Sequence, residues 1–252
     1  MNNVTLGILG GLGPMSGVLF CKLLTEHTKA EKDQQHLNFL LSSRADTPDR
    51  TDFILGDSGD DPAPVMIEEV RKLTAAGADV IAIPCNTAHY FYDRVSSVST
   101  VPIINIVEET VRFCKAQGYK RVGVLSTKGT ALSGAYRSVF EKEGIEHIPC
   151  DDTEQDYISD VIYNNIKKGT LPEKEKFISV CQGLYDRGCE TIVLGCTELS
   201  ILKAGFELDV GFVDSLDVLA LIALRLCNKE PCGFSAPLMN YCPDTVTNKE
   251  KE

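Results

Sequence analysis

Two cysteines end matching segments of the chain. Cys85 ends GADVIAIPC (residues 77–85), Cys196 ends GCETIVLGC (residues 188–196), and each lies eight residues after a glycine. A thiolate is a base and a thiol is an acid. Two thiols on opposite sides of one carbon can therefore remove a proton from one face and return a proton to the other. This is the chemistry of a two-base racemase.

The match between the halves extends to both sides of the cysteines. Upstream, GILGGLG from Gly7 has the pattern of GVLSTKG from Gly123, and downstream INIVEETV from Ile104 resembles VDSLDVLA from Val213. Similar segments in the same order, offset by a little over a hundred residues, indicate an internal repeat. The sequence therefore predicts two α/β units related by a pseudo-twofold repeat.

Apolar runs typical of strands alternate with helical patterns along the chain. The runs expected to form strands are 4–9, 37–41, 80–83, 103–106, 122–125, 146–148, 191–194 and 211–213. The clearest helical stripe is Leu216, Leu219, Ala220, Ala223 and Leu224, after a capping candidate at Asp214 or Ser215. This alternation predicts parallel sheets covered by helices on both faces. Ligands of such folds bind beyond the carboxyl ends of the strands, where both cysteines are expected.

Composition excludes several classes of function. The 252 residues are 43% hydrophobic and include 36 Asp and Glu against 25 Lys and Arg, a net charge of -11. Such a surface repels phosphate, so neither nucleic acid nor an anionic membrane is an expected partner. No signal peptide and no run of about 18 apolar residues is visible, and a cytoplasmic protein is expected. The ten cysteines form no CxxC pair and the four histidines are scattered, so we expect reduced thiols and no metal site.

The motifs at these positions resemble one known family. They are GILGGLGP (7–14), PDRT (48–51), PCNTAH (84–89), IKKG (166–169) and GCTELS (195–200). Together they resemble the aspartate/glutamate racemase superfamily and, within it, the aspartate racemases. Glutamate racemases have GCTH at the second cysteine, so Glu198 in this chain favours the aspartate branch.

The resemblance implies a fold and an assembly. It implies two pseudo-symmetric Rossmann-like parallel-sheet domains with the active site in the cleft between them, a homodimer, and no pyridoxal phosphate or metal. It also implies that the last helix returns to the first domain. We therefore expect one domain of residues 1–105 and 215–252 and a second of residues 106–214.

Carried over residue by residue, the resemblance makes Cys85 and Cys196 the base and acid. Side chains and backbone N–H groups at Asn86, Thr87 and Thr197 suit a carboxylate at helix N-termini, where charge develops during racemisation. Arg50 and Lys167 match the family's substrate-binding cations, and arginine can hold a carboxylate with two parallel bonds. The expected ligand is a small acidic amino acid, preferably aspartate.

Other residues near the motifs have weaker assignments. The glycine-rich turn imitates a dinucleotide loop, but the next strand end has Ser42, Ser43 and Arg44 instead of an acidic residue. We therefore interpret Gly11 as a close backbone approach to the substrate. Thr127, at the corresponding place in the second half, is a further candidate donor. Glu198 and His89 are possible auxiliary groups beside the thiols.

Three alternatives remain open at the level of sequence. The first is a glutamate racemase or broad-specificity racemase on the same scaffold. The second is a lyase or decarboxylase that uses a single thiol, against which the presence of both cysteines counts. The third is a non-catalytic binder of acidic amino acids, which would not need two thiols.

Overall fold

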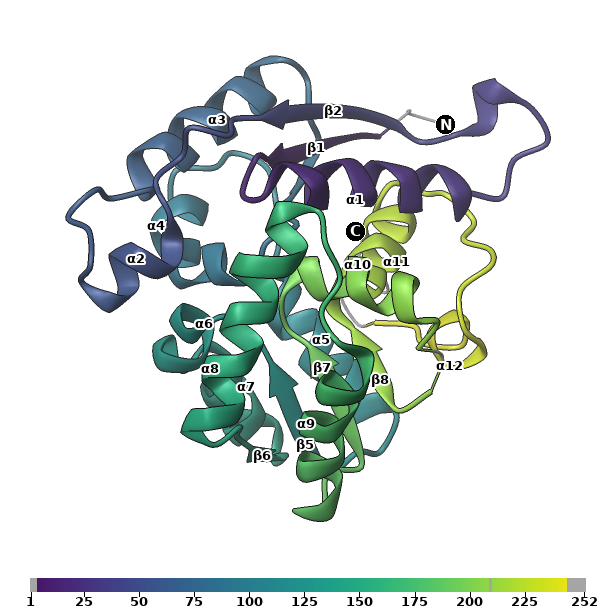
Figure 1. The fold of residues 1–252 in the computed structure, drawn as a ribbon. Coiled ribbons are helices and arrows are strands. Elements are labelled where there is room, and N and C mark those ends of the chain that lie inside the picture. Colours follow the sequence, from purple (N-terminus) through teal and green to yellow (C-terminus); the bar gives the residue numbers. More distant parts are fainter. Residues whose placement is uncertain (1–3, 209, 244–252) are drawn as a thin grey trace.

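The computed structural model describes residues 4–208 and 210–243, and these contain two four-stranded parallel sheets. The strand orders are β2-β1-β3-β4 and β6-β5-β7-β8 (Figure 1). The strands are β1 (Thr5–Gly10), β2 (Asn38–Ser43), β3 (Val80–Ala82), β4 (Ile103–Ile104), β5 (Arg121–Leu125), β6 (Glu146–Ile148), β7 (Thr191–Leu194) and β8 (Phe212–Asp214). Each predicted strand is present, and the predicted α/β fold with two parallel sheets is confirmed.

The second sheet repeats the first in packing as well as in order. A Cβ added to Gly7 on β1 would meet Cβ of Ala78 at 2.8 Å, and one added to Gly123 on β5 would meet Sγ of Cys189 at 3.0 Å. Gly7 and Gly123 start the matching segments of the repeat, and Ala78 and Cys189 each follow the glycine of the cysteine segments. Cys189 is therefore a small packing residue, as expected of a buried free cysteine.

Helices connect the strands and cover the sheets. In the first half they are α1 (Pro14–Glu26), α2 (Arg50–Leu55), α3 (Ala63–Ala75), α4 (Tyr92–Ser96) and α5 (Ile106–Ala116). In the second half they are α6 (Lys128–Ser133), α7 (Ala135–Glu143), α8 (Asp152–Asp160), α9 (Lys174–Asp186), α10 (Thr197–Phe206), α11 (Ser215–Leu226) and α12 (Ala236–Met239). Shorter helical segments are 3-10 turns at Asp33–Gln35, Thr87–Phe91 and Ile166–Lys168 and a π-helical segment at Val161–Asn165.

Local sequence sets where the main helices begin. Pro14, with its fixed φ and no N–H, starts α1. The Asn105 side chain accepts hydrogen bonds from the first turn of α5, and the Asp214 side chain accepts one from Leu216 in α11. Asn105 and Asp214 are equivalent in the repeat, so the same capping device follows the last strand of each sheet. Of the two predicted caps of α11, the structure selects Asp214.

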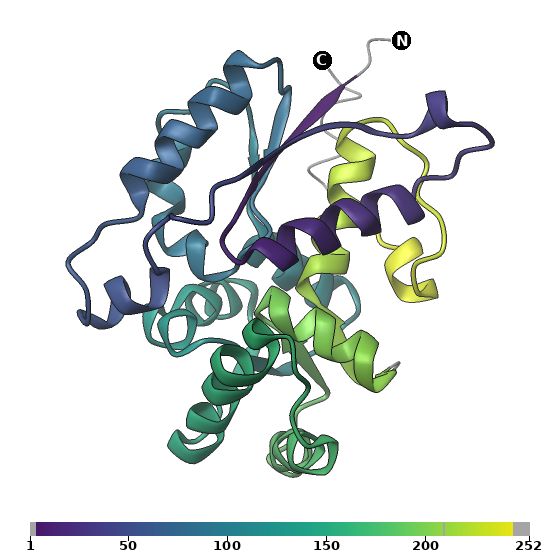
Figure 2. The same ribbon diagram turned by 45° about the horizontal axis from the view of Figure 1, so that its top comes forward.

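A common core joins the two sheets. One cluster of buried residues includes Leu6 and Ile8 of β1, Val122 and Val124 of β5, and most of α11. Helix α11 packs against α1 and α5 and contacts β3, β4 and β8 (Figures 1 and 2). Because α11 contacts both sheets, the predicted domain division at residues 105/106 and 214/215 stays a prediction. Residues 1–3, 209 and 244–252 of those predicted domains lie outside the described residues.

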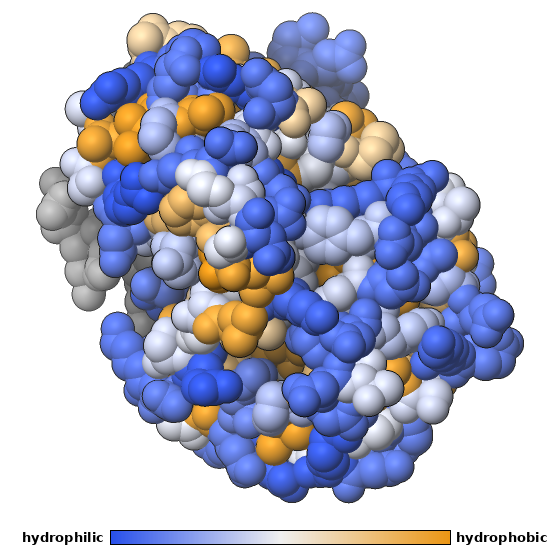
Figure 3. Space-filling view, turned by 60° about the vertical axis from the view of Figure 1, so that its left-hand side comes forward, coloured by the Kyte–Doolittle hydropathy of each residue, from blue (hydrophilic) through white to orange (hydrophobic). Residues whose placement is uncertain are grey.

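The surface is largely hydrophilic on one side of the molecule. Hydrophilic residues cover most of the face in Figure 3, and hydrophobic residues lie between them in separate groups. Within the described part of the chain, no helix is both long and apolar enough to cross a membrane.

Candidate active site

Both cysteines of the repeat line one small cavity between the sheets. Cys85 follows β3 and Cys196 follows β7, so each thiol lies beyond the carboxyl end of its strand. The lining residues are Leu12, Asp49, Arg50, Thr51, Cys85, Asn86, Thr87, Thr127, Tyr163, Lys167, Cys196, Thr197 and Glu198. The open volume is about 10 Å³, about the room of one water molecule. Lining side chains must therefore move to admit an amino acid.

Cys196 lies at the N-terminus of α10 and is hydrogen-bonded to an acid. Its thiol donates to Oε2 of Glu198 over 2.9 Å. Burial, and then the negative charge of Glu198, raise the pKa of the Cys196 thiol well above its ordinary value. The structure thus holds Cys196 as a thiol, with a proton acceptor already in contact.

Cys85 has a different electrostatic environment. Burial raises the pKa of its thiol, and the pKa is raised overall. The positive charge of Arg50, the largest charge effect on it, lowers the pKa, and the charge of Glu198 raises it. The backbone N–H of Ala88 also lowers it, because this donor stabilises a thiolate. Of the two thiols, Cys85 is therefore better placed to ionise.

The glycine-rich turn of the first half makes room for Glu198. A Cβ added to Gly13 would meet Oε1 of Glu198 at 2.5 Å. Any larger residue at position 13 would displace the carboxylate that accepts the Cys196 hydrogen bond. The turn after β1 thereby shapes the surroundings of the second thiol.

The residues that follow each cysteine connect the halves reciprocally. The Asn86 side chain donates to Oγ of Ser215 over 3.0 Å and accepts from the Tyr136 hydroxyl over 2.7 Å. In the opposite direction, the Thr197 hydroxyl donates to the Pro84 carbonyl over 3.2 Å. These buried bonds fix the two strand ends relative to one another.

Three threonine hydroxyls meet at another wall of the cavity. Oγ1 of Thr87 lies 3.0 Å from Oγ1 of Thr127 and 2.9 Å from Oγ1 of Thr130. Thr127 also caps α6 by accepting from the Thr130 N–H. The predicted donors Thr87 and Thr127, from different halves, are therefore in direct contact.

Arg50 is buried at the start of α2, with 7% of its surface exposed. Its Nη1 donates to the Thr47 and Pro48 carbonyls over 3.2 and 2.8 Å. Its Nε is buried and has no hydrogen-bond partner among the described residues. An unsatisfied buried donor beside a cavity is suited to a ligand carboxylate.

Lys167 enters the cavity from the segment after α8. Its Nζ lies 3.7 Å from Oδ2 of Asp49 and 4.0 Å from the ring centre of Tyr163. The Tyr163 hydroxyl donates to Oδ1 of the same Asp49 over 3.3 Å. Burial raises the pKa of Asp49, but the charges of Lys167 and Arg50 outweigh it, and the pKa is lowered overall. Asp49 is thus an ionised partner that holds Lys167 in place.

Two predicted site residues do not line the cavity. A Cβ at Gly11, whose φ is +86°, would overlap the backbone of Arg44, so this glycine is required for chain packing whether or not it meets substrate. His89 is buried with Nδ1 2.8 Å from the Cys85 carbonyl and Nε2 accepting from the Ile106 N–H over 3.2 Å. Burial lowers the pKa of His89, so it is a neutral ring that links backbone groups.

Sequence reasoning did not select Asp49, Thr51, Tyr163 or Leu12, which also line the cavity. Asp49 and Thr51 flank Arg50 within PDRT, so the motif contained a signal for them. Tyr163 lies four residues before Lys167, a spacing that brings side chains together on a helix. Among the described residues, no three or more His, Cys, Asp or Glu side chains form a potential metal site.

Comparisons with known proteins identify the protein family and the class of enzyme. The family model for Asp/Glu/Hydantoin racemase matches residues 9–223. The chain belongs to this family and is by class an amino-acid racemase, an isomerase.

Relatives within the family are named for different substrates. The chain is 28% identical over 222 residues to the broad-specificity amino-acid racemase RacX of Bacillus subtilis, covering 85% of this chain and 94% of RacX. It is 28% identical over 178 residues to a glutamate racemase of Aquifex pyrophilus, covering 68% of this chain and 66% of that one. The Picrophilus torridus aspartate racemase structure matches with a TM-score of 0.78 at 25% identity, covering 91% of this chain and 96% of that one.

Proposed function

We propose that this protein interconverts L- and D-aspartate with Cys85 and Cys196 as its two bases. The observation that carries the proposal is that both strand-end thiols line one cavity together with the two cations Arg50 and Lys167. A dicarboxylate matches two cations, and a stereocentre held between two thiols can lose and regain its proton on opposite faces.

The mechanism moves one proton on each side of Cα. The Cys85 thiolate takes the α-proton of one enantiomer and becomes a thiol. The carbanion's charge spreads into the α-carboxylate, where the Thr87 hydroxyl, the Asn86 amide and the backbone N–H of Thr197 donate hydrogen bonds. The Cys196 thiol then protonates the opposite face and becomes a thiolate.

The reverse reaction begins from the Cys196 thiolate. Glu198, in contact with Sγ of Cys196, is the group that takes the thiol proton when Cys196 must ionise. Arg50 binds the side-chain carboxylate and Lys167 supports it. Following the sequence resemblance, we also propose that the enzyme works without pyridoxal phosphate or metal, as a cytoplasmic homodimer.

Similarity to RacX favours a second candidate, a broad-specificity racemase on the same scaffold. Incubation with L-aspartate, L-glutamate and L-alanine in deuterated water separates these functions, because racemisation replaces the α-proton by deuterium. Selective exchange and racemisation of aspartate is expected. Equal rates for all three substrates would favour broad specificity, and no exchange would leave a non-catalytic binder.

Arg50 provides the matching test of substrate binding. Arg50→Ala should raise KM for aspartate by about a hundredfold or more, because a charge-assisted contact at a desolvated site is worth several kcal/mol. Racemisation of aspartate by this variant at the wild-type rate would show that Arg50 does not bind the substrate.

A further inference from the structure

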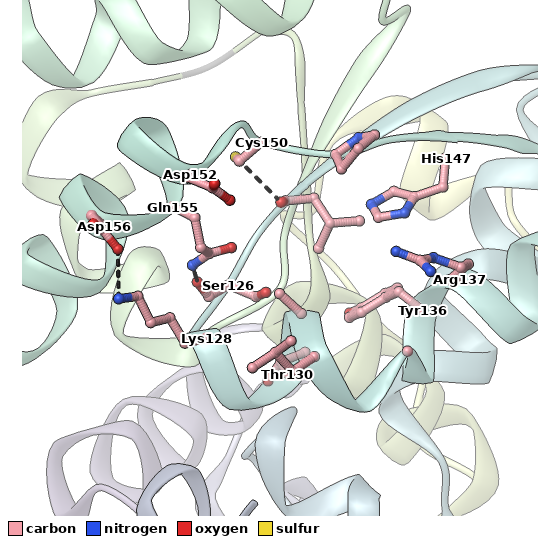
Figure 4. A pocket seen from close by; sticks show the side chains of 15 residues that line it. Ser126, Lys128, Thr130, Tyr136, Arg137, His147, Cys150, Asp152, Gln155 and Asp156 are labelled. Atoms are coloured by element: carbon pink, nitrogen blue, oxygen red, sulfur yellow. Dashed lines mark hydrogen bonds and ion pairs between the residues drawn. The ribbon is translucent and has the colours of Figure 1, made fainter. Parts of the chain in front are cut away.

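The second half contains a larger pocket that is separate from the catalytic cavity. Its volume is about 610 Å³, within the range of small-molecule sites, and it shares no lining residue with the catalytic cavity. It lies over the carboxyl ends of β5 and β6, between α6, α7 and the start of α8 (Figure 4). Thr130 of α6 faces this pocket and bonds Thr87 on the catalytic side, so α6 forms the wall between the two.

One side of the pocket carries hydrogen-bond donors without partners. Arg137 and His147 lie there together (Figure 4). Within the described part of the chain, neither side chain has a hydrogen bond or ion pair with another residue, although the His147 ring stacks on Phe140. A free guanidinium beside an imidazole is suited to a carboxylate.

The opposite side carries acceptors. Asp152 and Gln155 lie there (Figure 4), and Nε2 of Gln155 donates to the Ser126 carbonyl over 2.9 Å, which leaves its Oε1 free to accept. Further along, Lys128 and Asp156 form an ion pair of 2.5 Å and neutralise one another. The charges left for a ligand are therefore Arg137 on one side and Asp152 on the other.

Apolar side chains also line the pocket. They are Val124, Ala131, Leu132 and Pro149, and Leu132 is 71% exposed. A ligand that covers this surface removes apolar area from water. The pocket thus presents a cation on one side, an anion on the other, and apolar residues within the same lining.

We propose that this pocket is a second binding site, for a short zwitterion with a carboxylate at one end, an ammonium group at the other and an apolar stem between. The carboxylate binds Arg137 and His147, the ammonium group binds Asp152, and the stem covers Leu132 and Val124. Free ω-amino acids and short apolar peptides both have this chemistry.

Calorimetric titration with 6-aminohexanoate tests the proposal, because this probe has no stereocentre and cannot be racemised. Binding is expected, whereas hexanoate and hexylammonium, which each lack one charge, should bind at least about tenfold more weakly. No binding of 6-aminohexanoate at about 10 mM, or equal binding of hexanoate, would overturn the proposal. A second arm with alanyl-leucine identifies the ligand source, since the tighter of the two zwitterions marks a peptide or an ω-amino acid.

Substitutions of the pocket residues test whether 6-aminohexanoate binds in this pocket. Arg137→Gln and Asp152→Asn should each weaken 6-aminohexanoate binding by about tenfold or more and leave aspartate racemisation unchanged. The matched controls Arg71→Gln and Asp93→Asn replace exposed residues outside the pocket and should bind as wild type does. Binding that survives both pocket substitutions would place the probe elsewhere and refute the site.

Discussion

The thiol of Cys196 donates a hydrogen bond to Oε2 of Glu198, two positions further along the chain, over 2.9 Å. At Cys85 the largest charge effect is instead that of the Arg50 cation. Burial raises the pKa of both thiols, but the largest charge effect lowers the pKa at Cys85 and raises it at Cys196, although the sequence around them is repeated. This asymmetry suits a pair in which one member starts as a thiolate and the other as a thiol.

Glu198→Gln should move the pH dependence of catalysis. The negative charge of Glu198 raises the pKa of Cys196, so its removal lowers that pKa, and the alkaline limb of kcat/KM moves to lower pH. Near about pH 8 we expect a loss of about tenfold or more. The profile measured with L-aspartate checks this, with Glu69→Gln, a buried carboxylate outside the cavity, as control. An alkaline limb at the same pH in both variants would show that Glu198 does not control Cys196.

Each of the two thiols should be indispensable for racemisation. Cys85→Ala and Cys196→Ala should each lower the rate of aspartate racemisation by about a thousandfold or more, because one proton transfer loses its carrier. Each variant keeps one base, so each should still catalyse elimination of the β-substituent from one enantiomer of a β-substituted aspartate. The two variants should act on opposite enantiomers.

Chiral chromatography measures both reactions, and Cys114→Ala is the control. Cys114 is a buried thiol on α5 away from the cavity, so its removal should cost about 1 kcal/mol of stability and leave the activity intact. A near-normal rate in either Cys85→Ala or Cys196→Ala would remove that residue from the mechanism.

Adjacent lysines offer a matched pair. Both are exposed, but Lys167 lines the cavity, whereas Lys168 does not and donates to Asn164 over 2.7 Å. Lys167→Gln should raise KM for aspartate by about tenfold, because it removes one charged contact with the substrate. Lys168→Gln should change KM by less than about twofold. Steady-state kinetics of both variants decides the point. The same KM in Lys167→Gln and Lys168→Gln would rule out a substrate contact for Lys167.

Much of the fold was predictable because the repeated segments contain the apolar runs that form the strands. The eight apolar runs became strands, and a cysteine directly after a buried parallel strand had to lie at the carboxyl edge, where ligands bind. The glycine at position 11 shows the limit of such reasoning. Its positive φ follows from a tight turn, but the neighbour it accommodates, the Arg44 backbone, depends on tertiary packing.

Tyr163 and Glu198 show what sequence could not supply. Tyr163 lies in the π-helical segment Val161–Asn165, whose wider turn no hydrophobic period reveals. Its position in the sequence predicts that Glu198 is a neighbour of Cys196, but its contact with the thiol depends on Gly13 from the other half of the chain. A local π-helical turn thus determines the place of Tyr163, and a contact between elements distant in sequence determines that of Glu198.

The last prediction concerns stability at acidic pH. Burial, and then the charge of Arg137, lower the pKa of His147 from 6.5 to about 4. The unfolded chain therefore binds a proton below about pH 6.5 that the folded protein does not accept until about pH 4. Stability from this residue is fully present above pH 6.5 and is lost as the pH falls from 6.5 to 4.

His147→Gln should therefore reduce the loss of unfolding free energy between about pH 7 and pH 4.5 by about 1–3 kcal/mol relative to wild type. Urea unfolding at the two pH values measures this difference, and the carboxylates that titrate in the same range are common to both proteins. Arg137→Gln should act in the same direction but less strongly, because it removes the second cause of the lowered pKa and leaves the burial. An equal loss of unfolding free energy in wild type and His147→Gln would show that folding does not lower the pKa of His147.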